Sequence, residues 1–251
     1  METTSAMHLK WIWSEHGTWA VLWTAFGCGL LLAWPPTWIT LCTLVGLSAV
    51  AAAKVLALRM HKGHVSLRLV GAYLIAGGAA LLPLLLAAPL PLVLAGAVGA
   101  PFMAVYLRRS KSPRWTRRLT VEYAGVGLMA LSAGLAVLSA RPGAMGQAVL
   151  ASILVASLFL PGVPRARLLK TRESSLRWTL LATSLLGALA FVLAAAAGFM
   201  PWWGALGGLA FSGDLRAGLL APRVTARHLG LILTLRNAGA ALLLALAWKP
   251  F

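Results

Sequence analysis

The stretch TWITLCTLVGLSAVAAAKVLALRMHKGHVSLR, residues 37–68, decides the class of this protein. Residues 37–57 are apolar or small apart from one charge, Lys54. A helix needs about 20 such residues to cross a hydrocarbon core of roughly 30 Å. The run is followed at once by a basic segment that contains Arg59, Lys62 and Arg68. An apolar run with a basic end is typical of a membrane-spanning helix.

The same alternation continues along the whole chain. Of its 251 residues, 60% are hydrophobic and only 11% are charged, whereas a soluble domain averages about 25% charged residues. The apolar runs are as long as a spanning helix and do not alternate in polarity as barrel strands do. The sequence therefore predicts an all-α, polytopic integral membrane protein built as a helical bundle.

We expect about nine transmembrane helices, separated by Pro- and Gly-containing turns or by basic connections. The expected spans are residues 18–34, 37–57, 70–88, 91–107, 119–140, 145–160, 179–198, 202–220 and 229–248.

Basic residues fall on alternate connections between these spans. Besides Lys10, they cluster in residues 54–68, 108–118, 165–177 and 216–227, and the exceptions are Arg141 and Lys249 on the other side and Arg236 within the last span. By the positive-inside rule this bias places the N-terminus and the even-numbered connections in the cytosol. We divide the chain into a cytosolic N-terminal segment, residues 1–17, and a single transmembrane domain, residues 18–248.

The net charge of +17 is explained by this topology and by attraction to anionic lipid head groups, the expected partners. No soluble domain remains for nucleic acid, so nucleic-acid binding is not expected. On the opposite side, tryptophans are expected to form an aromatic belt at the outer interface. These residues are Trp34, Trp38, Trp202, Trp203 and Trp248.

Glu15 and His16 stand side by side where the first span begins. One interpretation is structural: Ser14 caps the helix and Glu15 lies in its positive first turn. The other is functional: a carboxylate and an imidazole at a cytosolic mouth are candidate acid/base catalysts. Both interpretations stay open.

Four charges lie inside or at the end of apolar spans, where a charge costs several kcal/mol unless it faces water or a partner. They are Lys54, Asp214, Arg216 and Arg236. Lys54 either snorkels to the head groups or faces a cavity that binds an anion. Asp214 and Arg236 either pair between helices or line a polar cavity that holds a ligand. Arg59, in the connection beyond Lys54, is a further candidate for ligand binding.

Residues 165–173 mix basic residues with Leu168 and Leu169. As an amphipathic helix, this segment would lie on the membrane surface; as a cap over a cavity, it would present arginines such as Arg172 to phosphate oxygens. Glu122 follows Arg118 by four residues, which favours a local helical ion pair. His61 and His64 lack a third ligand nearby, so no metal site is predicted.

The residues Glu15, His16, Gly17 and Trp19 match the Glu-His-Gly-x-Trp signature of YwiC-like bacterial membrane proteins, which this chain resembles. The resemblance implies a multi-pass protein of the bacterial cytoplasmic (inner) membrane. The nine-span layout is also similar to the UbiA superfamily of intramembrane prenyltransferases, which hold Mg²⁺ through Asp-rich motifs. The corresponding stretches, residues 54–68 and 165–177, contain no Asp, so Mg²⁺ is not expected and no cofactor is predicted.

The leading hypothesis is a protein that binds, and transforms if it is an enzyme, an amphipathic anionic ligand such as a lipid or isoprenoid phosphate. An enzyme of this kind would be a UbiA-like transferase without the metal motifs, with Glu15 and His16 as catalytic residues. The predicted ligand-binding residues are Lys54, Arg59, Arg172, Asp214, Arg216 and Arg236. A small-anion transporter and a non-catalytic accessory or assembly protein are the alternatives.

Overall fold

The computed structural model describes residues 16–60, 65–109, 115–171 and 175–212, with residues 235, 239–240 and 242–248 near the C-terminus. These parts of the chain are helical and contain no strand. The helices are α2 (His16–Leu32), α3 (Trp38–Met60), α4 (Leu67–Ala87), α5 (Pro89–Arg109), α6 (Trp115–Ala140), α7 (Met145–Phe159), α8 (Gly162–Thr171), α9 (Ser175–Ala196) and α10 (Trp202–Ser212).

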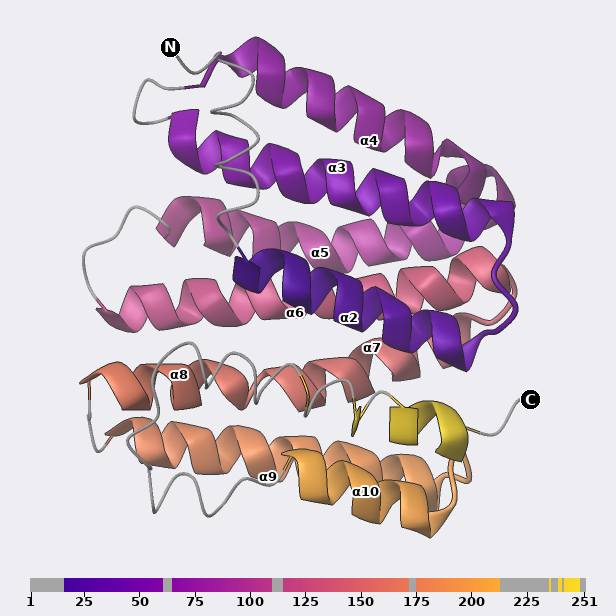
Figure 1. The fold of residues 1–251 in the computed structure, drawn as a ribbon, viewed down its shortest axis with the longest axis vertical. Helices are drawn as coiled ribbons and strands as arrows, with labels where there is room; N and C mark the ends of the chain where they lie inside the picture. Colours follow the sequence, from indigo (N-terminus) through magenta and orange to yellow (C-terminus); the bar gives the residue numbers. More distant parts are fainter. Residues whose placement is uncertain are drawn as a thin grey trace.

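The helices lie side by side in one bundle and alternate in direction along the chain, except that α8 continues the direction of α7 (Figure 1). Helix α6 is central: it packs against α2, α7, α5 and α3. Helices α3 and α4 form one edge of the bundle, whereas α9 and α10 form the other (Figure 1). Backbone groups cannot be left unsatisfied in lipid, which explains why a chain of this composition forms helices that satisfy their own backbone bonds.

Five helical stretches of the described chain are long and apolar enough to cross a membrane: Trp38–Ala57, Leu67–Ala87, Leu119–Ala140, Met145–Arg165 and Leu176–Ala196. They coincide with the second, third, fifth, sixth and seventh predicted spans. Two shorter apolar helices, Val21–Leu32 and Pro89–Val105, fall on the first and fourth. The structure therefore has the helices of a multi-pass membrane protein.

The last two predicted spans are described only in part. Helix α10 covers the first half of the eighth span. Residues 242–247 form the helical end of the ninth span, and Trp248 follows the last helical residue. The total of nine spans stays a prediction.

Small residues bring the helices into close contact. A Cβ built on Gly77 of α4 would lie 3.1 Å from the carbonyl oxygen of Gly46 on α3. One built on Gly134 of α6 would lie 2.6 Å from the carbonyl oxygen of Ala148 on α7. Such contacts are the main source of helix association where lipid is as apolar as the side chains.

Side-chain hydrogen bonds add to this packing between helices. The Ser132 hydroxyl of α6 donates to the Leu22 carbonyl of α2 at 3.3 Å. The Thr37 hydroxyl, just before α3, donates to the Ser139 carbonyl of α6 at 2.9 Å. The hydroxyls of Ser132 and Thr37 are thus satisfied by the backbone of neighbouring helices.

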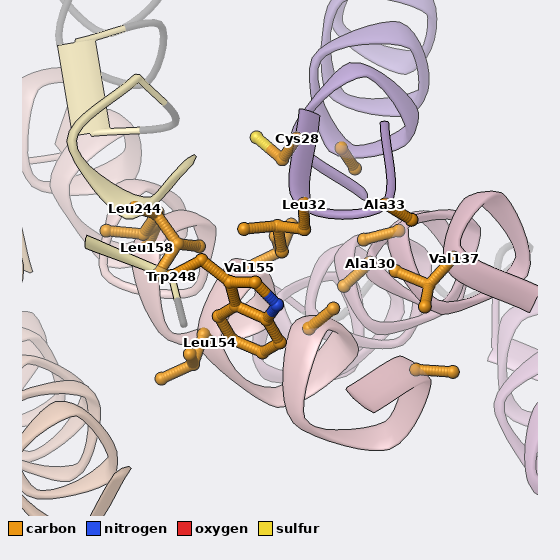
Figure 2. Packing of buried hydrophobic residues seen from close by; sticks show 14 of the residues in the cluster. Cys28, Leu32, Ala33, Ala130, Val137, Leu154, Val155, Leu158, Leu244 and Trp248 are labelled. Atoms are coloured by element: carbon orange, nitrogen blue, oxygen red, sulfur yellow. The ribbon is translucent and has the colours of Figure 1, made fainter. Parts of the chain in front are cut away.

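One tryptophan of the predicted outer belt is not at an interface. Trp248 is 7% exposed and belongs to the main hydrophobic cluster. Its indole lies near Leu154 and Leu158 of α7 and near Leu244 (Figure 2). The prediction for Trp248 is wrong because the C-terminal helix returns into the bundle and buries its last aromatic residue. The other four tryptophans of the set are exposed, as the belt requires.

Candidate functional site at the basic end of the helices

The basic residues of the described helices gather at one end of the bundle. Helices α3, α5 and α8 end there, and α4, α6 and α9 begin there, at the left in Figure 1. The basic residues in these terminal turns include Arg59, Arg68, Arg109, Arg117 and Arg177, and Arg167 lies in the middle of the short helix α8. Arg141 lies at the opposite end, where its guanidinium donates to the Trp34 carbonyl at 3.3 Å. The charge bias read from the sequence thus corresponds to one face of the structure, which we call the basic end.

Most of the predicted site residues lie outside the described part of the chain. They are Glu15, Arg172, Asp214, Arg216 and Arg236. The Asp214–Arg236 pair and a shared cavity therefore stay predictions.

Three predicted residues lie on described helices. His16 is the first residue of α2, and Arg59 lies in the last turn of α3; the structure describes their backbones only. Lys54 is half-buried in α3 and is flanked by the buried residues Ala53 and Val55. A half-buried ammonium near the basic end of a span fits both interpretations of Lys54.

The basic end holds an ion pair between helices that the sequence did not single out. Arg167 of α8 donates from Nε to Glu122 Oε2 of α6 at 3.0 Å, and from Nη2 to Glu122 Oε1. The arginine fork thus takes both carboxylate oxygens. The hydrogen bonds to Glu122 raise the pKa of Arg167 above its usual value, so the guanidinium is charged at any physiological pH.

The structure gives Glu122 a partner on another helix, while the predicted pair with Arg118 is not tested. We predicted Arg118, one turn away on the same helix, but both oxygens of the carboxylate face Arg167, 45 residues further along the chain. The reason is geometric: α8 passes close enough to α6 for a planar fork to bind both oxygens at once. The side chain of Arg118 itself lies outside the described set.

Helix α8 resumes almost in line with α7 after a break at Leu160 and Pro161 (Figure 1). Pro161 has no N–H group and so cannot continue the helical bonding to Ser157. A tighter bond from the Val163 amide to the Leu160 carbonyl, 3.2 Å long, bridges the break. The sixth predicted span, expected to end at residue 160, is therefore continued by a helix that carries the basic segment.

The basic segment is a helix, as predicted, and its apolar side is held by its neighbours. Leu168 is buried against Leu176 and Leu180 of α9, and Leu119 of α6 packs against this cluster. The helix is thus anchored to α6 and α9 instead of lying on lipid alone. This anchoring fixes the arginine that pairs with Glu122.

A tyrosine next to Glu122 lies between the ion pair and α9. The Tyr123 hydroxyl, next to Glu122, is buried and faces Thr183 of α9 without a hydrogen bond of normal geometry. One nitrogen of the half-buried Arg165 guanidinium, Nη1, is also buried. We call the set Glu122, Tyr123, Arg165, Arg167 and Thr183 the α6–α8–α9 junction.

The junction is rich in hydrogen-bond donors and suits oxygen anions. The guanidinium groups of Arg165 and Arg167 lie two residues apart and therefore on different sides of α8. Each of them, and the Tyr123 phenol, can donate to phosphate or carboxylate oxygens. Within the described residues, no group of three His, Cys, Asp or Glu side chains is placed to hold a metal ion. The sequence signal for the junction was Glu122 itself, an acid at the start of an apolar span that needs a partner.

The sequence model of the family described as YwiC-like protein matches residues 12–137, half of the chain. The match includes Glu15, His16 and helices α2 to α5, and it ends near the end of α6. No curated protein and no solved structure matches the chain.

Proposed function

We propose, from the premise that the chain belongs to the YwiC-like protein family, that it binds an amphipathic anionic ligand at the basic end of its helices. The ligand is of the lipid-phosphate or isoprenoid-phosphate type. Its anionic group lies at the basic end, and its chain lies among the apolar helices. The protein resides in the bacterial cytoplasmic membrane with this end facing the cytosol.

The observation that carries the proposal is the α6–α8–α9 junction. Arg165 and Arg167 sit where α7 and α8 leave the apolar layer, and Arg167 is only 20% exposed. Charges held at this depth are expensive and usually serve a partner or a ligand. A planar guanidinium recognises phosphate oxygens through two parallel hydrogen bonds, which a solvated lysine cannot do.

The remaining residues of the site are proposed from the sequence. Lys54, Arg59, Arg172, Arg216 and Arg236 supply further cationic contacts, and Asp214 balances them. Glu15 and His16 are the acid/base pair if the bound ligand is transformed. The mechanism needs no metal, because arginine and lysine neutralise the anion directly. The resemblance to the UbiA superfamily rests on the layout of spans alone and stays a prediction.

The test is mass spectrometry of lipids retained on protein purified in a mild detergent. The wild type is expected to retain a phosphate-bearing amphiphile in near-stoichiometric amount. The double variant Arg165→Ala/Arg167→Ala is expected to lose it. Arg177→Ala is the matched control, because Arg177 is an exposed basic residue at the same end of the bundle. Absence of any anionic amphiphile from the folded wild type would contradict the proposal.

A further inference from the structure

We propose that Glu122 is an internal competitor for the ligand: its carboxylate occupies the arginine fork that the ligand's phosphate takes on binding. The inference rests on the proposed function and adds a regulatory contact to the same site. In the ligand-free protein the fork of Arg167 is closed by Glu122. In the bound protein two phosphate oxygens replace the carboxylate, and Glu122 turns into water.

The geometry of the pair supports this exchange. Arg167 uses Nε and Nη2, the edge of the guanidinium that also binds two phosphate oxygens side by side. A carboxylate in this position has the charge and oxygen spacing of the group that would replace it. The Glu122 carboxylate thus occupies the position on Arg167 that the phosphate of the proposed ligand would take.

Exposure shows which partner is free to leave. The Glu122 side chain is 44% exposed, whereas that of Arg167 is 20% exposed. Glu122 can leave the pair without moving α6, because nearly half of its side chain is not covered by the protein. Arg167 stays in place, because the neighbouring Leu168 is buried against α9. The cation is the fixed member of the pair, and the anion is the exchangeable one.

The energy of the pair permits the exchange. Ion pairs with this much solvent exposure contribute little to stability. The free energy of such a pair corresponds to a factor of about two to five in an equilibrium constant. A phosphate that also places an acyl or isoprenoid chain in the membrane gains far more than this by burying apolar surface. Glu122 therefore lowers affinity modestly, and the apolar chain of an amphiphilic ligand readily offsets this cost.

The experiment measures binding of farnesyl phosphate to the purified full chain by equilibrium dialysis in detergent micelles. Farnesol, inorganic phosphate and phosphatidic acid are separate arms, so that the apolar chain, the phosphate and the lipid source are distinguished. The variants are Glu122→Gln, Glu122→Ala, Arg167→Lys and the control Arg177→Ala. Thermal unfolding of each variant without ligand reports whether the fold is kept.

The inference predicts that Glu122→Gln and Glu122→Ala bind the phosphate-bearing amphiphile about two- to fivefold more tightly than the wild type. Arg167→Lys is expected to weaken binding about tenfold, because the fork is lost while the charge is kept. Arg177→Ala should match the wild type. Inorganic phosphate, which meets the same competitor, should also bind about two- to fivefold more tightly after Glu122 is replaced.

Two outcomes separate the inference from the proposed function. If the wild type binds farnesyl phosphate or phosphatidic acid but neither Glu122 variant binds it more tightly, the competitor role is overturned and the proposed function stands. If the folded wild type and the Glu122 variants bind neither amphiphile, the competitor role of Glu122 and the proposed function are both overturned.

Discussion

The contact between α2 and α6 gives a sharp test of the packing, because two glycines of α2 differ only in what they face. A Cβ built on Gly29 would lie 2.7 Å from the carbonyl carbon and 2.8 Å from the Cα of Ala133 on α6. A Cβ built on Gly27 meets nothing within 4 Å. The substitutions Gly29→Ala and Gly27→Ala therefore add the same methyl group to the same helix in two different environments.

The magnitude follows from two terms. Replacing glycine by alanine within a helix stabilises the helix by about 0.5–1 kcal/mol at either position. At Gly29 the new methyl group meets backbone atoms that cannot rotate away, so α2 and α6 must move apart. Overpacking of this kind costs about 1–3 kcal/mol. The gain in helix stability from alanine is the same in both variants, so it cancels when they are compared. Gly29→Ala should therefore be about 1–3 kcal/mol less stable than Gly27→Ala.

The assay is unfolding of both variants and the wild type in mixed micelles with increasing dodecyl sulfate, followed by circular dichroism. Gly27→Ala should equal or slightly exceed the wild type in the free energy of unfolding, and Gly29→Ala should fall below both. Equal stability of the two variants would refute the close approach of α2 to Ala133.

Substitutions at three further residues test individual contacts. Tyr123→Phe should leave the free energy of unfolding without ligand within about 1 kcal/mol of the wild type, because the hydroxyl has no hydrogen bond of normal geometry to lose. It should also weaken binding of farnesyl phosphate about three- to tenfold in the same dialysis assay; unchanged binding would exclude Tyr123 as a ligand donor. Trp248→Ala should destabilise the fold by about 3–5 kcal/mol in the micelle assay because Trp248 is buried. Trp248→Phe should cost much less, because it keeps an aromatic ring in the core. Equal costs of the two substitutions would contradict the core position of the ring. Thr37→Val should cost about 1–2 kcal/mol, measured in the same way, because the hydroxyl donates to the Ser139 carbonyl and accepts from the Thr40 amide at the start of α3. No loss of stability would contradict both bonds.

The helices themselves could be predicted because one physical requirement dominates their formation. A run such as residues 37–57 has no way to satisfy its backbone in lipid except as a helix. The basic residues Arg59 and Arg68 at its end also indicated which helix ends share a face. Successive spans alternate in direction, so the basic ends of all spans come to lie on the same side. The structure confirms both features for the described helices.

The partner of Glu122 could not be predicted, because it depends on how far α8 extends and on which side it passes α6. Sequence spacing favoured Arg118, four residues away, and gave no information on Arg167 across the bundle. Burial of Trp248 was missed for a related reason. An aromatic residue near the end of a span fits an interface equally well, and only the packing against Leu154 and Leu158 distinguishes the two positions.

Cysteine accessibility tests the central claim, that the basic ends of the helices share one side of the membrane and that this side is the cytosol. Single cysteines would replace Arg68 and Arg177 at the basic end and Gly143 at the other end, in a background that lacks Cys28 and Cys42. An impermeant maleimide added to right-side-out and inverted membrane vesicles reports each position separately. The account predicts labelling of positions 68 and 177 only in inverted vesicles and of position 143 only in right-side-out vesicles. Labelling of positions 68 and 177 from opposite sides, or of both from the outside, would contradict it.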